Sequence, residues 1–293
     1  MKIGAARFIA VLALTALVAG CGSGNGGSSS TRSGTQSDAN VRVDPAIAKQ
    51  VPAKFRSKTL IVATDASYPP NEFLAGDGKT VQGMDPDLAR ALARVMGVKA
   101  TVRNATFDAI IPGLASGKYD LGMSSFTDTK EREKTVDFVT YFNAGTSFYT
   151  KRGVPAVGAL ADLCGKTVAV EKGTTQQTDA GTQAKKCSVK VLTFPDQNGA
   201  NLAISSGRAD VGMADSPVAA YIVKRSNGQF ELSGEPYGVA PYGIAIPKDA
   251  QLERPIKAAL EVLMKNGTYS KILDRWGIQQ GAIKSPEINA ATS

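Results

Sequence analysis

A ten-residue pattern that occurs twice in this chain limits its possible folds more than any other feature. Residues 114–123 read LASGKYDLGM, and residues 204–213 read ISSGRADVGM. In both copies a helical stretch ends at a Ser-Gly turn and a short apolar strand follows. The apolar runs 60–63 and 167–170, each followed closely by an acidic residue, are a second and weaker pair. The sequence therefore predicts two related α/β units in tandem, with chance similarity in an Ala- and Gly-rich chain as the alternative.

Strand and helix patterns alternate along the first unit. Predicted strands lie at residues 60–63, 101–103 and 119–123, and predicted helices at residues 85–96 and 107–116. Asp85 is the expected N-cap of the first helix, with Pro86 at its first position. Alternation of this kind favours a mainly parallel sheet with helices on both faces.

The segment after Tyr242 does not begin a third unit. It predicts one strand at residues 243–246 and amphipathic helices at residues 255–266 and 268–276. Because two short helices cannot bury their apolar faces alone, we expect this segment to pack against an existing core.

The first 21 residues have the features of a secretory signal. Lys2 and Arg7 form a basic start, residues 8–18 are apolar, and small residues precede Cys21. Such a run is too short for a stable transmembrane span. Small residues before a cysteine resemble the bacterial lipobox, whose cysteine receives a diacylglyceryl group; an ordinary cleaved signal is the alternative. Residues 22–57 are then expected to form a flexible tether, because small polar residues dominate its first half.

Two further cysteines remain if Cys21 carries a lipid. Cys164 and Cys187 would then face an oxidising compartment, where a disulfide bond between them is expected. Two buried thiols are the alternative.

Composition excludes several functional classes. The chain contains no histidine, which removes His-based zinc sites and nucleophiles that depend on a histidine base. Its 34 Lys and Arg residues against 26 Asp and Glu residues give a formal charge of +8, and the basic residues are scattered. Since no nucleic-acid motif accompanies them, we interpret the excess as solvated surface charge and expect no nucleic-acid partner. No metal or other cofactor is predicted.

Polar residues cluster after four predicted strands. The clusters are Asp65 with Tyr68; Ser124, Ser125 and Thr127; Glu171 with Thr174, Thr175 and Gln176; and Asp215. In open α/β sheets, ligands bind beyond the carboxyl ends of the strands. Two clusters fall in each unit, so all four would converge on one small ligand if the units face each other.

Arg132 is the most informative candidate for binding an anion. A turn capped by Asp128 or Thr129 places it in the first turn of a helix. A cation is unfavourable there against the helix dipole, whereas a ligand carboxylate would be held by the guanidinium and by free backbone N–H groups. A surface arginine is the alternative. Asp215, in the second unit, either binds an ammonium group or caps the helix that starts at Pro217.

A series of short motifs runs in order through residues 58–277. They read TDASYPPNEF at 64–73, GMDPDL at 83–88, FDAIIPGL at 107–114, GKYD at 117–120, TKER at 129–132, VDF at 136–138, GTT at 173–175 and NGTY at 266–269. This series resembles the polar amino-acid solute-binding proteins of family 3.

The resemblance implies an α/β fold of the two-lobed, periplasmic-binding-protein-like type (type II), with a hinge between the lobes. Two crossover segments would lie near residues 142–146 and 239–243. The implied divisions are residues 58–144 with 243–280 for lobe 1, residues 145–242 for lobe 2, and residues 281–293 for a C-terminal tail.

By motif position, the resemblance also implies a site for a free amino acid. Arg132 would grip the α-carboxylate and Asp215 would bind the α-ammonium, while the ligand side chain would extend toward Asp65 and Glu171. The residues with implied ligand contacts are Asp65, Tyr68, Phe107, Ser125, Thr127, Arg132, Glu171, Thr174, Thr175, Gln176 and Asp215.

Such a protein would deliver its ligand to the transmembrane permease subunits of an ABC importer, as a monomer anchored through Cys21 to the outer face of the cell membrane. The acidic pair Asp65 and Glu171 favours arginine, lysine or ornithine, because opposite charges attract strongly in a cleft with little water. Asp65 also occurs in glutamine-binding relatives, so a glutamine- or glutamate-type ligand is the first alternative. A sensory protein and a secreted dehydratase on the same fold are the others, although no residue pattern demands catalysis.

Overall fold

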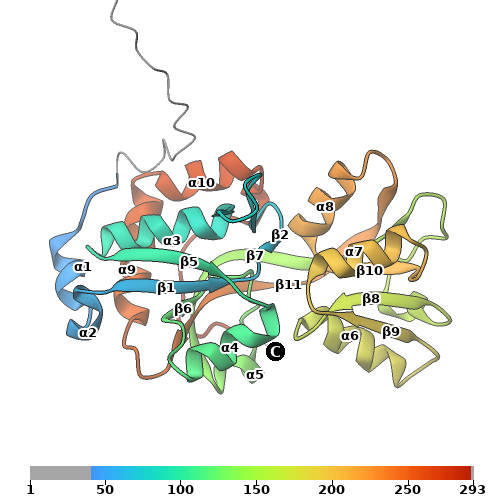
Figure 1. Ribbon diagram of the computed structural model, residues 1–293, viewed down its shortest axis with the longest axis horizontal. Helices are drawn as coiled ribbons and strands as arrows, with labels where there is room; N and C mark the ends of the chain where they lie inside the picture. Colours follow the sequence, from blue (N-terminus) through green and yellow to red (C-terminus); the bar gives the residue numbers. More distant parts are fainter. Residues whose placement is uncertain (1–40, 292–293) are drawn as a thin grey trace, which may run out of the picture. The chain divides into compact units, whose positions relative to one another are not determined.

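Two long strands run side by side and connect the two halves of the structure (Figure 1). The computed structural model describes residues 41–291, in which β7 (Val136–Lys151) pairs antiparallel with β11 (Phe230–Pro247). These residues belong to one compact unit, residues 36–293. The predicted signal peptide, the lipidation site Cys21 and the first part of the predicted tether lie outside the described residues.

The described residues form an eight-stranded sheet and a small three-stranded sheet. The large sheet has the strand order β5-β1-β6-β11-β7-β10-β8-β9, and the small one β2-β3-β4. The strands other than β7 and β11 are β1 (Thr59–Thr64), β2 (Ser67–Tyr68), β3 (Glu72–Leu74), β4 (Val81–Gln82), β5 (Lys99–Asn104), β6 (Leu121–Gly122), β8 (Thr167–Glu171), β9 (Lys190–Phe194) and β10 (Val211–Asp215). In the large sheet, β1 pairs in parallel with β5 and β6, and β8 pairs in parallel with β9 and β10. The predicted alternation and parallel pairing are confirmed on both sides of the central antiparallel pair.

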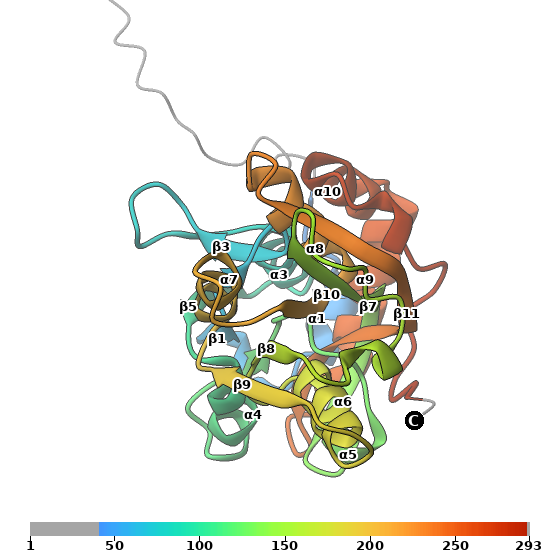
Figure 2. The same cartoon turned by 90° about the vertical axis from the view of Figure 1, so that its right-hand side faces the viewer.

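Helices cover both faces of each half of the sheet. We call the half that contains β1, β5 and β6 lobe 1 and the half that contains β8, β9 and β10 lobe 2. The helices of lobe 1 are α1 (Pro45–Gln50), α2 (Ala53–Arg56), α3 (Met84–Val95), α4 (Phe107–Ala115), α5 (Lys130–Glu133), α9 (Glu253–Lys265), α10 (Thr268–Trp276) and the 3₁₀ turn η3 (Gln279–Gly281); those of lobe 2 are η2 (Leu160–Leu163), α6 (Thr175–Ala184), α7 (Gln197–Ser205) and α8 (Ser216–Arg225). In lobe 2, α6 lies on one face of β8 and β9, and α7 lies on the other (Figures 1 and 2).

Both predicted crossover segments lie inside the long strands. Residues 142–146 belong to β7 and residues 239–243 to β11, where Ala240 pairs with Ala144 and Tyr242 with Phe142. The strand register shifts between Tyr237 and Ala240, which interrupts the regular pairing at the passage between lobes. The residue boundaries predicted for the lobes stay predictions, because the sheet continues through both.

The prediction that the tether extends to residue 57 is wrong. Residues 45–56 form α1 and α2, and the side chains of Ile47, Val51 and Phe55 are buried in the core of lobe 1. Asp44 caps α1, because its Oδ1 accepts hydrogen bonds from the backbone N–H groups of Ala46 and Ile47. Spaced apolar residues in this segment therefore make it part of the folded lobe.

The predicted N-cap of α3 is also wrong. The helix begins at Met84 with Gly83 as its N-cap, so Asp85 lies within the first turn. The Asp85 carboxylate points away from the helix end and accepts hydrogen bonds from Ser125 N at 3.0 Å and Tyr141 Oη at 2.8 Å. The Ser125 N–H and the Tyr141 hydroxyl are buried donors that need an acceptor. Asp85 provides that acceptor, although its sequence position predicted a helix cap.

Three clusters of buried apolar side chains fill the lobes. The largest lies in lobe 1 and includes Leu88 on α3 and Leu260 on α9, which accounts for the placement of the segment after Tyr242. Another lies in lobe 2 and includes Val168 and Met213. The remaining cluster has members from both lobes, among them Tyr68, Phe107, Ala169, Ala214 and Val218. Apolar contact between the lobes therefore concentrates around one region.

A disulfide bond joins Cys164 to Cys187 in lobe 2, with an S–S distance of 2.06 Å. It ties the end of η2 to the residues that follow α6. Among the residues described, none of the helices has the length and apolar character needed to cross a bilayer.

Gly83 provides a stability test of the turn that starts α3. Its φ is +135°, and a Cβ there would lie 2.1 Å from the carbonyl oxygen of Asn71. We expect Gly83→Ala to lower the free energy of unfolding by about 3 kcal/mol, through backbone strain and overpacking. Gly78→Ala is the matched control, because Gly78 has φ +65° but no atom within 4 Å of the added Cβ; its loss should be about 1 kcal/mol. Urea unfolding measures both, and equal losses would contradict the packing argument.

Candidate functional site

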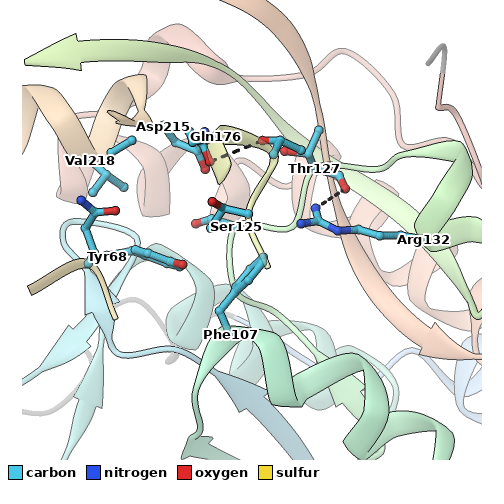
Figure 3. A pocket seen from close by; sticks show the side chains of 12 residues that line it. Tyr68, Phe107, Ser125, Thr127, Arg132, Gln176, Asp215 and Val218 are labelled. Carbon is cyan, nitrogen blue, oxygen red and sulfur yellow. Dashed lines mark hydrogen bonds between the residues drawn. The ribbon is translucent and has the colours of Figure 1, made fainter. Parts of the chain in front are cut away.

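One pocket lies where the polar clusters of the two lobes meet (Figure 3). Its lining comprises Tyr68, Phe107, Ser125, Thr127, Arg132, Thr174, Thr175, Gln176, Gln197, Ala214, Asp215 and Val218. Nine of the eleven residues predicted from the sequence are in this lining: all except Asp65 and Glu171. The carboxyl ends of β1, β6, β8 and β10 supply most of them, as expected for an open α/β sheet.

Arg132 occupies the first turn of α5, as the sequence predicted. Thr129 is the N-cap, since its Oγ1 accepts the Arg132 backbone N–H. The guanidinium donates from Nη1 to Thr127 O at 2.8 Å and lies 5.2 Å from the centroid of the Phe107 ring and 5.4 Å from that of the Phe126 ring. Burial lowers the pKa of Arg132 to about 10, so it stays protonated at neutral pH. These contacts hold a fixed cation at the edge of the pocket.

Ser125 lines the pocket and is held in an unusual backbone conformation. Its φ is +52°, a left-handed value that costs a non-glycine residue about 1–3 kcal/mol. Two buried acids compensate: Asp85 accepts the Ser125 backbone N–H, and Glu72 accepts the hydroxyl at 3.1 Å. Burial raises the pKa of both carboxyls, Glu72 well above 4.5 and Asp85 to about 6, which favours at least one shared proton. Glu72 and Asp85, which do not line the pocket, therefore fix the orientation of Ser125, which does.

Asp215 faces the pocket from the end of β10. Its Oδ1 accepts from Gln176 Nε2 at 2.7 Å, and its Oδ2 accepts from Tyr242 Oη at 2.6 Å. Its side chain does not cap α8, so the binding alternative is the one its geometry fits. Burial raises the pKa of Asp215 to about 6, and a cation nearby would favour its ionised form.

Asp65 and Glu171 come together although they lie on different lobes. Burial raises the pKa of Asp65 to about 6. Burial first, and then the charge of Asp65, raises the pKa of Glu171 to about 10. Both carboxyl oxygens of Glu171, and the hydroxyl of Tyr68, are buried without a hydrogen-bond partner among the residues described. The pair lies close enough to Tyr68 to act on it: the pKa of Tyr68 is raised first by burial and then by the charges of Glu171 and Asp65.

Aromatic rings pack together beside the pocket. Tyr68 and Phe107 lie 5.9 Å apart between centroids in an edge-on arrangement, and Phe107 stacks on Phe126 at 4.4 Å. In Figure 3, Tyr68 and Phe107 lie on one side of the pocket, with Asp215 and Gln176 on the other.

Thr174, Thr175 and Gln176 form the start of α6, where the helix leaves unpaired backbone N–H groups. Thr174 is the N-cap and accepts the Gln177 backbone N–H at 3.1 Å. Gln176 Nε2 also donates to Thr146 Oγ1 at 2.9 Å, which links the helix to β7. The N-terminus of α6 and its first residues therefore line the pocket from lobe 2, with the Thr174 hydroxyl occupied in the cap.

Three lining residues were not predicted: Gln197, Ala214 and Val218. Gln197 begins α7 directly after the N-cap Asp196, a strand-to-helix turn of the same type as residues 173–176. This repeated type of turn could have identified Gln197 from the sequence. Ala214 and Val218 are apolar and resemble any core residue, so the sequence held no signal for them.

Direct polar contacts join the lobes around the pocket. Arg132 Nη2 donates to Gly173 O at 3.0 Å, and Gln197 N donates to Ser67 Oγ at 3.1 Å. Lys172 forms an ion pair with Asp108 at 2.8 Å outside the pocket. In this arrangement the lobes are in contact on both sides of the site.

The set of groups suits a zwitterion with a third polar end. A guanidinium, hydroxyls and a helix N-terminus favour a carboxylate, while Asp215 favours an ammonium group. Across the described part of the chain, no group of three or more Cys, Asp or Glu side chains is placed to hold a metal ion.

Known proteins share this sequence and fold. Residues 60–279 match the bacterial extracellular solute-binding proteins, family 3. Arginine-binding protein ArgT of Corynebacterium glutamicum is 34% identical, over 84% of this chain and 83% of its own length. A solved ancestral arginine-binding protein bound to arginine is 40% identical, with a TM-score of 0.72 over 75% of this chain and 99% of its own. An ancestral arginine-binding protein solved bound to glutamine is 39% identical, with a TM-score of 0.71 over 75% and 98% of the two chains.

The two-lobed fold expected from the motif series is therefore confirmed, and its pocket lies between the lobes. By the match over residues 60–279 and this fold, the chain belongs to the bacterial extracellular solute-binding proteins of family 3.

Proposed function

We propose that this protein binds free L-arginine in the inter-lobe pocket and delivers it to the permease of an ABC importer. The observation that carries the ligand assignment is the buried pair Asp65 and Glu171, in which both Glu171 oxygens lack a hydrogen-bond partner among the described residues. Buried acids without a partner are costly, and a guanidinium supplies both the charge and several donors. The arginine-binding relatives support the same assignment.

In this proposal each end of the ligand has its own partner. Arg132, with the hydroxyls of Ser125 and Thr175, holds the α-carboxylate. Asp215 holds the α-ammonium, and the aliphatic part of the ligand passes between Tyr68 and Phe107. The guanidinium reaches Asp65 and Glu171 behind Tyr68, which requires the Tyr68 ring to move, since neither acid is in the pocket lining.

Capture follows from a hinge. The lobes open by bending β7 and β11 where their pairing is irregular, and they close when ligand contacts from both lobes form. The importer would recognise the closed form. The extracellular family also supports an extracytoplasmic location, and we propose that a lipid on Cys21 holds the protein at the outer face of the membrane.

Glutamine is the alternative ligand, because a related ancestral protein has been solved with it. It would make the same α-carboxylate and α-ammonium contacts and leave Glu171 protonated. No arrangement of the described residues specifically favours the dehydratase alternative.

A ligand screen is the direct test. The chain from Gly22 onward, freed of bound ligand by unfolding and refolding with the disulfide intact, is titrated with arginine, lysine, ornithine, glutamine and glutamate while its melting temperature is followed. Ligands that bind the native state raise that temperature. We expect the largest rise with arginine; a larger rise with glutamine would replace the cationic assignment but keep the function, and no rise with any amino acid would overturn both.

Glu171 should make arginine binding depend on pH. Unliganded Glu171 is protonated below its raised pKa of about 10, and a bound guanidinium favours the carboxylate, so binding releases a proton. The association constant for arginine should therefore rise between pH 6 and about 8.5, by up to about tenfold per pH unit. Calorimetry in buffers of different ionisation enthalpy counts the protons. Glu171→Gln should remove the slope and leave glutamine binding intact; a flat profile in the unmodified protein would contradict the placement of the guanidinium.

Arg132 should require its guanidinium and not charge alone. Arg132→Lys keeps the charge but loses the fork that binds a carboxylate through two parallel hydrogen bonds. We expect binding of the amino acid to weaken by about 100-fold. Arg103→Lys, at an exposed position of β5, is the matched control and should bind normally. Equal affinities of the two variants would remove Arg132 from the site.

A further inference from the structure

The C-terminal segment is joined to lobe 1 by an isolated β-bridge. We call residues 287–291 the C-terminal strap. Ile288 forms an antiparallel bridge with Val139 near the start of β7. Around it, Thr140 N donates to Glu287 O at 2.9 Å and Asn289 N donates to Phe138 O at 3.1 Å. The strap therefore pairs with residues 138–140 of β7, and these come before residues 146–150 of β7, which pair with β10.

Side chains reinforce this pairing. Asn289 Oδ1 accepts the Phe138 backbone N–H at 2.8 Å, and Asn289 Nδ2 donates to Asp137 Oδ1 at 2.8 Å. Glu287 N donates to Thr140 Oγ1 at 2.8 Å. Hydrogen bonds at Asp137, Phe138 and Thr140 of β7 thus fix the register of the strap, and they direct Ala290 and Ala291 toward one part of lobe 1.

That place is the turn that carries Arg132. Ala290 N donates to Asp128 Oδ2 at 2.8 Å, and Ala291 N donates to Glu133 Oε1 at 3.2 Å. Asp128 and Glu133 flank Arg132 on its two sides along the chain, and Asp128 is only 2% exposed. The strap therefore holds both ends of the short segment on which the guanidinium depends.

The segment from Asp128 to Glu133 needs such support because its own hydrogen bonds do not make it stable. Helix α5 has only four residues, and a helix of that length is not stable on its own. Its other ties include the Thr129 cap, the bond from Asp128 N to Pro241 O on β11, and the bond from Arg132 Nη2 to Gly173 O of lobe 2. The Arg132 guanidinium bonds back to Thr127 O, at the beginning of the same segment. Movement of this segment would therefore displace the guanidinium from the pocket.

From this geometry we propose that the C-terminal strap positions Arg132, so that recognition of the ligand's α-carboxylate depends on residues 287–291. The proposal rests on the proposed function, in which Arg132 binds that carboxylate. The strap residues are positioning residues: none of them lines the pocket, and they act through Asp128 and Glu133.

The test compares arginine with argininamide, which has the same side chain and ammonium group but no carboxylate. Ala290→Pro removes the N–H that Asp128 accepts. Ala282→Pro is the matched control: it removes one tail hydrogen bond, from Ala282 N to Gln279 O, at a residue outside the strap whose φ of −59° suits proline. Calorimetry gives both affinities for each variant.

We expect Ala290→Pro to weaken arginine binding by about tenfold and to leave argininamide binding unchanged, so that the preference for the carboxylate falls. Ala282→Pro should keep both affinities. Equal weakening of both ligands, or no change in either, would overturn the proposal. If Ala290→Pro does not fold, Asp128→Ala and a chain that ends at Ser285 are measured in the same way, with circular dichroism and urea unfolding to establish the native state.

Failure of the proposed function gives a different result. An unmodified protein that binds another amino acid in place of arginine would contradict the arginine assignment alone. The same comparison would then use that amino acid and its α-amide, and the ratio of the two affinities would still decide whether the strap positions Arg132.

Discussion

The antiparallel pairing of β7 with β11 is the constraint on which the rest of this structure depends. It runs through both lobes, so each lobe completes its own parallel sheet against the same two strands. The pairing shifts register three times within residues 233–243 of β11: between Ser233 and Tyr237, between Tyr237 and Ala240, and between Tyr242 and Gly243. A continuous ladder with one irregular zone gives rigid lobes and a bend between them. It also brings the strand ends that carry the polar clusters to face one another.

Acid groups in and beneath the pocket define its electrostatics. Asp65, Glu171 and Asp215 each have a raised pKa, with burial as the first cause, and the Glu72 and Asp85 pair below Ser125 behaves in the same way. A site in which acids outnumber cations is poorly satisfied without a ligand, and it gains most from a ligand that is itself rich in donors and positive charge. Arg132 is the exception, and in the proposed function it binds the carboxylate of the ligand.

Support for the site comes from residues remote in the sequence. Glu72 and Asp85 hold Ser125 in a left-handed conformation, and Tyr242 on the return strand fixes Asp215. The C-terminal strap adds a contact to the Arg132 turn. The bonds to Ser125 are buried and the others are partly buried, so their loss would leave polar atoms with little access to water as a substitute partner. Functional side chains on short turns are thereby held by distant parts of the chain.

The sequence by itself determined the alternation of strands and helices, the tandem units and most of the pocket lining, because strand ends, helix caps and Gly turns are local patterns. It could not reveal that residues 45–56 fold onto lobe 1 or that Asp85 turns inward from α3, since those outcomes depend on a core and on donors supplied by Ser125 and Tyr141. Nor could it show that Asp65 and Glu171, from different lobes, come close enough for one charge to raise the pKa of the other. Only the tertiary structure decided these points, because burial and pairing between residues far apart in the chain set the energy of each polar group.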